Sequence, residues 1–404
     1  MSEVLDSAAA MVGGGAGSAS SREWAGAGDG AAWPPLAETE RGALRELLIH
    51  GPLPRAEIAR RLGMSRASLT RVTRALMEHG LIAEGEVELR GATGRPSELL
   101  VVRRDARHFF GVKLTGDTAF AVVTDLGARI VARHEEPIVS TEVDAVIDQI
   151  VAAHARFAAD YPAITAGGVT LAGDLTEVGG RQIVKDSPFL GWHDVFLADL
   201  VTERLGIPMS AENDVRALTA TEHWFGAGVG CRSLALITIG AGIGFGFVID
   251  DRLVTGHHGR AGSLDHLPID PAGPICGRGH RGCASAVLPS PAIVDALRMP
   301  GLDYPGVVAL ARDGHAPALR AFADAGHALG VLIGTVANAL DPQKIVLTGD
   351  GLPLMELAGD VVHSVIDQVR APGVPPIELD VQPFEFDEWA RAGAVLGIRT
   401  ALQF

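Results

Sequence analysis

The sequence has little of what marks a secreted or membrane protein. It contains only three cysteines in 404 residues, so a disulfide framework is not expected. It has no run of about 18 uncharged apolar residues, the length that a membrane-spanning helix needs. Its first 21 residues contain no lysine or arginine, whereas a secretory signal begins with a basic segment. These absences predict a soluble, cytoplasmic protein.

Positive charge is also scarce, but it is unevenly distributed. The whole chain has 34 Lys and Arg against 49 Asp and Glu, a net charge of −15. Residues 37–104, however, contain twelve Arg and nine Glu, a balance of +3, and residues 55–74 contain six Arg and one Glu, a balance of +5. Because attraction to phosphate acts over about a Debye length, this local excess indicates contact with nucleic acid despite the acidic whole.

Composition and periodicity divide the chain into three segments. In residues 1–36, Gly, Ala and Ser occupy 21 of the 36 positions without regular periodicity, so a disordered extension is expected. Residues 37–104 begin with helical periodicity and end in two strand-like runs. In residues 105–404 strand-like runs alternate with helical stretches, which predicts an α/β domain.

A helix-turn-helix pattern follows the first helical stretch of the middle segment. The run "RAEIARRLG" ends at Gly63, and Ser65 then caps "SRASLTRVTRALMEHG", in which Leu69, Val72 and Leu76 form an apolar stripe. Two short helices joined by a glycine-containing turn are typical of DNA-binding helix-turn-helix motifs. The next run, "LIAEGEVELRGATGRPSELLVVR", predicts a two-stranded wing.

The polar face of the second helix carries side chains suited to DNA. Guanidinium groups bind guanine edges and phosphates, and hydroxyl groups bind either. Arg95 precedes a proline at the wing tip, where an arginine can enter the minor groove. The predicted DNA contacts are Arg55, Ser65, Arg66, Ser68, Thr70, Arg71, Arg74 and Arg95. The alternative is a small three-helix domain whose arginines are only solvated.

Five motifs occur in an order found in one family. They are the winged helix ending in "GRP", then "SAENDVRALTATE", "TIGAGIGFGFVIDDRLVTGHHGRAGSLDH", "CGRGHRGC" and "ANALDPQKIVLTGDG". With them the chain resembles the ROK family (repressors, open reading frames and sugar kinases) over residues 40–404. The resemblance implies a two-lobed actin-like ATPase fold of the ribonuclease-H type behind the winged helix-turn-helix, with a sugar held between the lobes.

Departures from the family's kinases argue against phosphoryl transfer. The kinases have an aspartate in a glycine-rich turn for phosphate and metal, whereas "GVKLTGDT" places Lys113 at that position and Thr115 at a glycine. A cation cannot coordinate the Mg²⁺ that neutralises the transferring phosphoryl group. A compensating metal ligand elsewhere is the alternative. The glycines of "TIGAGIGFG" and "LTGDG" correspond to the family's phosphate-side turn and adenosine loop, or only form tight turns.

The resemblance implies a sugar site at Asn213, Asp214, Ser263 and His266. In the kinases this aspartate is the general base and the asparagine holds sugar hydroxyls. Two family glutamates are replaced here, by Ser263 and Ser285. Because charge-assisted hydrogen bonds are roughly twice as strong as neutral ones, a standard hexose should bind weakly, or the effector differs. For Asp214, a helix N-cap is the alternative role.

The family's zinc motif is only partly preserved. A histidine followed by Cys-x-Cys-Gly-x-x-Gly-Cys would give three ligands here, because Arg278 stands at the middle cysteine. His280 lies two residues later and could supply the fourth ligand that structural zinc needs. The predicted zinc ligands are therefore His266, Cys276, His280 and Cys283. A metal-free loop and a disulfide between the two cysteines are the alternatives.

These observations together predict a transcriptional regulator. We expect a repressor of sugar-metabolism genes that binds a double-stranded DNA operator as a homodimer or homotetramer. Its catalytically inactive kinase-like domain would bind a sugar or amino sugar, free or phosphorylated. The alternatives are an active ATP-dependent sugar kinase with an attached DNA-binding domain, and a repressor that no small ligand controls. No membrane association is expected.

Overall fold

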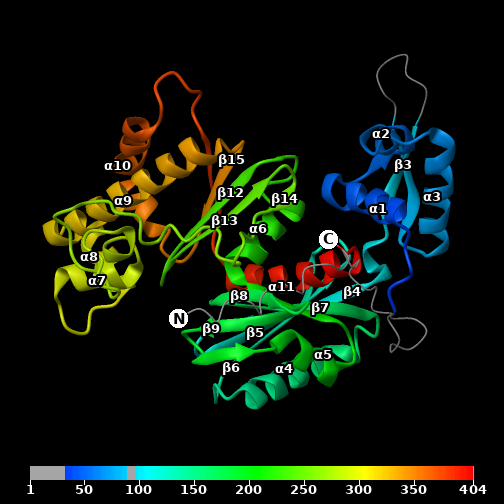
Figure 1. Ribbon diagram of the computed structural model, residues 1–404, viewed down its shortest axis with the longest axis horizontal. Helices are drawn as coiled ribbons and strands as arrows, with labels where there is room; N and C mark the ends of the chain where they lie inside the picture. The colour runs from blue at the N-terminus through cyan, green and yellow to red at the C-terminus, as the bar shows by residue number, and fades with distance from the viewer. Residues whose placement is uncertain (1–31, 89–96, 404) are drawn as a thin grey trace, which may run out of the picture.

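A computed structural model describes residues 32–88 and 97–403, and it has a small N-terminal domain beside two larger lobes (Figure 1). The small domain has a helix-turn-helix and a three-stranded sheet. Its helices are α1 (Glu38–His50), α2 (Arg55–Arg61) and α3 (Arg66–Glu78). Its strands, in the order β1-β3-β2, are β1 (Leu53–Pro54), β2 (Ile82–Glu88) and β3 (Ser97–Val102). The predicted two-stranded wing is therefore joined by a third, very short strand.

The core of the small domain continues into the lobe beneath it. The apolar stripe of α3 packs on α1, and Trp33 and Leu36 are buried in the same cluster. We assigned these two residues to the disordered extension; the structure instead packs Trp33 edge-on against Phe109, with ring centroids 6.1 Å apart. Phe109 lies at the start of the next domain, so a shared core joins the two parts.

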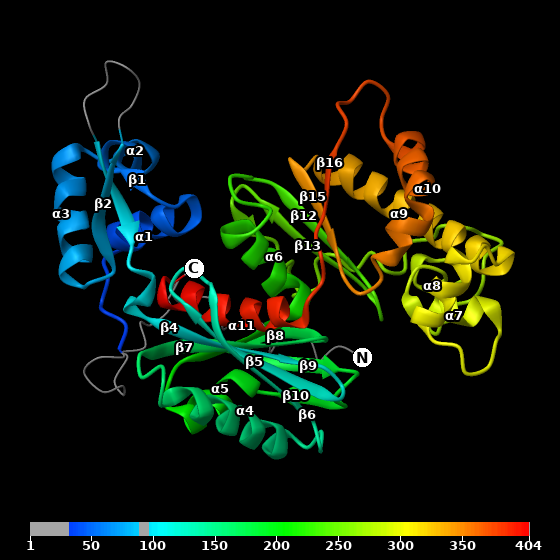
Figure 2. The ribbon, with the colours of Figure 1, turned by 180° about the vertical axis from the view of Figure 1, so that it is seen from behind.

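The first lobe is built on a five-stranded sheet with the order β11-β7-β4-β5-β6. Helices α4 (Val143–Ala158) and α5 (Leu197–Leu205) lie against one face, as Figure 2 shows. The strands of this sheet are β4 (His108–Leu114), β5 (Thr118–Asp125), β6 (Ile130–Pro137), β7 (Ile164–Leu171) and β11 (Met209–Asn213). A second sheet consists of β8 (Asp174–Val178), β9 (Arg181–Ser187) and β10 (Trp192–Val195).

The second lobe repeats this topology, with the strand order β14-β13-β12-β15-β16. In each lobe three consecutive antiparallel strands are followed by two strands that join in parallel. The strands are β12 (Leu234–Ile239), β13 (Ile243–Ile249), β14 (Arg252–Leu253), β15 (Lys344–Thr348) and β16 (Glu378–Val381). Helices α7 (Ser290–Leu297), α8 (Tyr304–Arg312), α9 (Ala316–Leu340) and α10 (Pro353–Val369) accompany them. This repeat is the two-lobed arrangement expected from the sequence.

Two helices cross between the lobes and join them. Helix α6 (Asp214–Phe225) follows the last strand of the first lobe but packs on the sheet of the second. Helix α11 (Phe386–Ala401) ends the second lobe but packs on β4 and β7 of the first. Both helices approach their sheets at glycines: a Cβ on Gly111 would overlap the α11 backbone, and one on Gly246 would overlap Thr219 of α6. Glycines of "TIGAGIGFG" thus serve packing.

The described part of the chain contains no helix long and apolar enough to cross a membrane. The alternation of strands and helices that was expected over residues 105–404 is present in both lobes.

Candidate functional site

Helix α3 presents an exposed row of arginines away from the rest of the small domain. Arg66, Arg71 and Arg74 are exposed, whereas Leu69, Val72 and Leu76 on the other face are buried. Within residues 32–88 and 97–403, none of these three arginines forms a salt bridge. Their guanidinium groups are therefore available to phosphates and base edges.

The hydroxyl groups at the start of α3 serve the helix itself. Ser65 is the N-cap and accepts a hydrogen bond from the Ser68 amide at 3.1 Å. Its own hydroxyl donates to the Ser68 hydroxyl at 2.9 Å, and the Thr70 hydroxyl donates to the Arg66 carbonyl. These three residues fix the helix end that would enter the groove, although Thr70 stays exposed.

Arg55, another predicted DNA contact, pairs with two carboxylates of the wing strands in the absence of DNA. Its guanidinium lies 2.7 Å from the Glu84 carboxylate on β2 and 3.6 Å from that of Glu98 on β3. Arg55 thus ties the start of α2 to the wing strands, a positioning role. Arg95, the predicted minor-groove contact, lies outside the described residues.

At the start of α6, Lys113 of β4 forms a buried ion pair with Asp214. The Lys113 ammonium donates to Asp214 Oδ2, and the two side chains are only 6% and 9% exposed. The ammonium also lies 5.0 Å from the ring centroid of Trp389 on α11. Hence the lysine that the resemblance places at the kinases' aspartate position contacts the residue that it places at their general-base position. Asp214 is then held by a fixed cation.

Asn213, rather than Asp214, caps α6. Its Oδ1 accepts hydrogen bonds from the amides of Val215 and Arg216, and its Nδ2 donates to the Gly173 carbonyl at 3.0 Å. Asp214 is the first residue of the helix and accepts from the Val215 amide at 2.9 Å. The alternative that Asp214 is the N-cap was therefore wrong by one residue.

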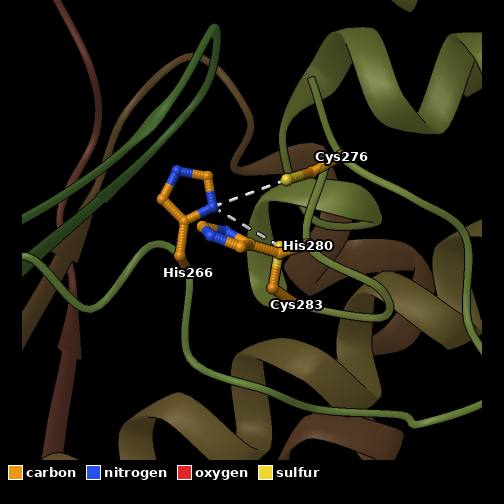
Figure 3. Close-up of side chains that lie close together, drawn as sticks. All are labelled: His266, Cys276, His280 and Cys283. Atoms are coloured by element: carbon orange, nitrogen blue, oxygen red, sulfur yellow. Dashed lines mark hydrogen bonds between the residues drawn. The ribbon is translucent and has the colours of Figure 1, made fainter. Parts of the chain in front are cut away.

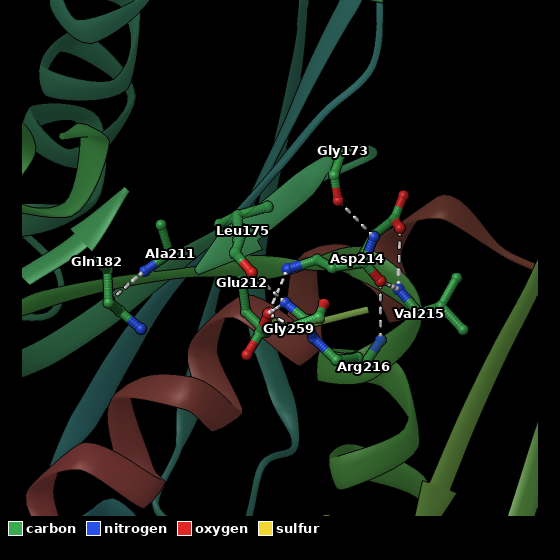
Figure 4. Close-up of polar contacts among 10 residues, drawn as sticks. Gly173, Leu175, Gln182, Ala211, Glu212, Asp214, Val215, Arg216 and Gly259 are labelled. Atoms are coloured by element: carbon green, nitrogen blue, oxygen red, sulfur yellow. Dashed lines mark hydrogen bonds and ion pairs between the residues drawn. The ribbon is translucent and has the colours of Figure 1, made fainter. Parts of the chain in front are cut away.

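Arg216 joins the two lobes beside this helix start. Its buried guanidinium donates to the carbonyl of Gly259, in the loop after β14, and to the carbonyl of Leu175 on β8 (Figure 4). Glu212 pairs with the same guanidinium and neutralises it. Gly259 has φ +68°, and a Cβ there would overlap Leu175. The loop that carries Ser263 and His266 is thereby held close to the first lobe.

The serines that replace the family's glutamates are occupied locally. Ser263 is exposed and donates to the carbonyl of Arg260, and Ser285 donates to the carbonyl of Asp265 at 2.8 Å. Arg260 in turn pairs with Asp174 of β8 at 2.7 Å. Protein groups thus satisfy part of the hydrogen-bonding capacity of this loop.

A carboxylate faces the glycine turn between β12 and β13. A Cβ on Gly240 would overlap the Asp350 carboxylate, and the Gly351 amide donates to the Ile239 carbonyl at 2.9 Å. Burial raises the pKa of Asp350. Nearby, burial followed by the charge of Asp350 raises the pKa of Tyr304 to about 12. A negative group against this turn opposes phosphate binding there.

Four metal-binding side chains converge in the segment after β14. The ligand atoms of His266, Cys276, His280 and Cys283 all lie within 4.8 Å of one another (Figure 3). His266 Nδ1 is 3.6 Å from Cys276 Sγ and 3.5 Å from Cys283 Sγ. Tetrahedral zinc with ordinary bond lengths separates nitrogen and sulfur ligands by about 3.6 Å, so the residues present fit the metal. Both cysteines are free thiols, which contradicts the disulfide alternative.

The surroundings of this group suit a metal. Burial raises the pKa of the Cys276 thiol, but hydrogen bonds with the backbone of Arg278 and His280 outweigh burial and leave its pKa lowered. The second nitrogen of His266, Nε2, lies 3.1 Å from the Asp265 carboxylate. A carboxylate on the outer nitrogen is a common way to orient a metal-ligating histidine. The outer nitrogen of His266 is thus engaged by Asp265.

Several of these residues were not predicted from the sequence. Arg216 and Asp350 lie inside recognised motifs, but the position of a residue in a motif does not reveal which distant residues its side chain contacts in the folded protein. Trp389 comes from α11, more than 270 residues after Lys113. Asp265 could have been suspected, because a carboxylate directly before a metal-ligating histidine is a usual second partner.

Comparisons with known proteins assign both parts of the chain. The ROK family model matches residues 109–380, and the MarR family model matches residues 36–84. The DNA-binding transcriptional repressor Mlc of Escherichia coli K12 is 25% identical over 385 residues, which cover 89% of this chain and 93% of that protein. The xylose repressor of Bacillus spizizenii W23 is 25% identical and covers 83% of this chain and 87% of the repressor.

Solved structures agree with this assignment. A ROK family transcriptional regulator, described as a homologue of E. coli MLC protein, has a TM-score of 0.77 and 26% identity, and covers 90% of this chain and 96% of that one. A ROK family glucokinase from Streptomyces griseus has a TM-score of 0.61 and 25% identity, with 72% of this chain covered and 99% of the enzyme. The winged-helix and two-lobed folds predicted from the sequence are confirmed, and the protein is a member of the ROK family.

Proposed function

We propose that this protein is a DNA-binding transcriptional repressor controlled by a sugar and that it does not transfer phosphate. The Lys113–Asp214 ion pair carries the proposal, because it places a cation where kinases need a metal ligand and occupies the general-base position. The full-length similarity to proteins named as repressors supports it. As a regulator of transcription, it would act inside the cell.

Operator binding would use α3 in the major groove of double-stranded DNA. The exposed arginines Arg66, Arg71 and Arg74, with Thr70, form the recognition face, while Ser65 and Ser68 hold the helix end. The wing tip with Arg95 would contact the minor groove. Two copies of the chain, as a homodimer or within a homotetramer, would place two α3 helices on half-sites about one helical turn apart.

The effector would bind at the start of α6 in the interlobe cleft. Asn213 and Asp214 begin this helix, and Arg216 links it to the loop that carries Ser263 and His266. Asp214 can accept from a sugar hydroxyl even while paired, because a carboxylate has about four lone-pair positions. A sugar, an amino sugar or a phosphorylated sugar remains the effector class.

Helix α6 offers a direct connection from this site to the DNA-binding domain. Its twelve residues span about 18 Å, from Asn213 in the cleft to Trp224, which is buried in the cluster shared with α1. Arg399 of α11 lies over the Trp224 ring at 4.6 Å. A sugar that binds one lobe arrangement more tightly would thus shift the equilibrium toward that arrangement and toward the position of the winged helix that goes with it. The size of this shift is set by the difference in the sugar's affinity for the two states.

Zinc would hold the loop from His266 to Cys283, with His280 in place of the absent cysteine. When bound, zinc would supply a structural cross-link and no step in catalysis. The role of this chain's residues is positional: Asp265 orients His266, and the cross-link fixes the loop after β14.

The proposal is tested by two assays on one preparation. DNA binding to the region upstream of the gene is followed by fluorescence anisotropy for the wild type and for Arg74→Ala, and ADP formation is followed with ATP, Mg²⁺ and a panel of hexoses. Salt-sensitive binding that Arg74→Ala weakens, with no ADP formed, is expected. Sugar-dependent ADP formation would instead identify an active sugar kinase.

A further inference from the structure

A cavity of about 400 Å³ lies where α6 and α11 meet the edge of the second lobe's sheet. We call it the hinge cavity, because the two helices that join the lobes form two of its walls. Its lining comes from α6 and the residues just after it, from β15, and from α11 and the segment that leads into it: Leu218, Glu222, Gly226, Ala227, Val346, Thr348, Gln382, Pro383, Phe384, Glu385, Glu388, Trp389 and Arg391. Small-molecule sites have volumes of roughly 300–1,000 Å³, so this cavity is large enough for a ligand.

Its charged lining is predominantly acidic. Glu222, Glu385 and Glu388 face one cation, Arg391, which gives a net charge of −2. Arg391 lies 2.6 Å from the Glu388 carboxylate but 4.0 Å from that of Glu222, so it is mainly engaged by Glu388. Glu385 is exposed and forms no ion pair with any described residue.

Nearby positive charge does not compensate for the burial of the Glu222 carboxylate. Its side chain is 14% exposed, and its Oε2 accepts from the Ala227 amide at 2.7 Å. Burial raises the pKa of Glu222, and the backbone amide and Arg391 lower it by less than burial raises it. A cation in the cavity would supply the missing compensation.

The apolar lining is aromatic. Phe384 and Trp389 stand edge to face with ring centroids 6.1 Å apart, and Leu218 and Val346 complete the apolar side. Aromatic rings beside carboxylates are the combination that binds ammonium groups with hydrocarbon substituents, since the ring faces attract the cation and exclude water.

We propose that the hinge cavity is a second ligand site, separate from the sugar cleft, that takes a small organic cation such as a primary or quaternary amine. Trp389 gives this site a connection to the cleft, because its ring also lies 5.0 Å from the ammonium of Lys113, which holds Asp214. The ligand would therefore contact a side chain that packs on the buried ion pair.

The test is calorimetric titration of the full chain with choline and with 3,3-dimethyl-1-butanol, the neutral carbon isostere of choline. Choline should bind at least about 5-fold more tightly than the isostere, and salt should weaken only choline. Glu385→Gln and Glu222→Gln should each weaken choline binding about 2- to 5-fold. The matched control is Glu203→Gln, an exposed glutamate on α5 that is remote from the cavity lining.

Glu385→Gln keeps the test independent of folding, because Glu385 is exposed. The proposal is overturned if choline does not bind the wild type at millimolar concentration, or if the isostere binds equally well. It is also overturned if both cavity variants bind choline as the Glu203→Gln control does.

Discussion

Removing the charge of Lys113 should destabilise the protein strongly, because it leaves Asp214 buried without its partner. Both side chains are less than one-tenth exposed, and breaking one member of a buried ion pair costs about 3–5 kcal/mol. We therefore expect Lys113→Met, which retains much of the side-chain volume, to lower the free energy of unfolding by about that amount. An exposed pair is typically worth about 0–1 kcal/mol.

The double variant separates the charge effect from the loss of packing. In the double variant Lys113→Met with Asp214→Asn, no charge is left buried. The decrease in the free energy of unfolding should therefore be about 2 kcal/mol or less. The hydrogen bond from the Val215 amide can be kept by asparagine. Equilibrium urea unfolding of the wild type, both single variants and the double variant gives the coupling energy between the two side chains.

The control is the exposed ion pair of Lys185 with Asp194, whose side chains are 47% and 62% exposed. Lys185→Met should cost less than about 1 kcal/mol. If Lys113→Met costs no more than Lys185→Met, or if the double variant is as unstable as the single one, the assignment of Lys113 as the buried counter-ion of Asp214 is wrong.

Three further predictions concern other parts of the molecule. Arg71→Ala should weaken operator binding by about 1–3 kcal/mol if the arginine reads a guanine, whereas Arg312→Ala on α8 should bind as the wild type does; equal binding by both variants in anisotropy titrations would argue against α3 as the recognition helix. Metal analysis after dialysis should find about one zinc per chain, with less in His280→Ala and Cys283→Ala, and an unchanged content in both would disprove this ligand set. One of the two tyrosines should ionise near pH 12 in an alkaline absorbance titration, a step absent from Tyr304→Phe. Because the folded pKa is raised, the stability that protonated Tyr304 contributes is present below about pH 10 and is lost between about pH 10 and 12; ionisation of both tyrosines near pH 10 would refute its burial.

Local patterns in the sequence predicted the elements well. The stripe of Leu69, Val72 and Leu76 and the cap at Ser65 depend only on neighbours within one helix, and the structure confirms them. Alternating strand-like and helical runs likewise indicated an α/β domain, and periodicity of this kind is displayed directly by a single sequence. The two lobes were implied only by the resemblance that the order of motifs carries.

Contacts between distant segments could not be predicted in this way. Lys113 and Asp214 are 101 residues apart, and no pattern in the sequence indicates that the replacing lysine pairs with the aspartate. Arg55 was assigned to DNA from the charge of its segment, but Glu84 and Glu98 reach it only after the wing folds. The burial of Trp33 similarly depends on Phe109 of the next domain.

A sugar bound between the lobes should control the winged helix. Fluorescence anisotropy of DNA from upstream of the gene tests this control when the DNA is titrated with the full chain in the presence of sugars, amino sugars and their phosphates. We predict that one of these compounds changes DNA affinity and that Asn213→Ala abolishes its effect without abolishing DNA binding. DNA binding that no compound in the panel alters would contradict sugar control and leave a repressor without a small-molecule effector.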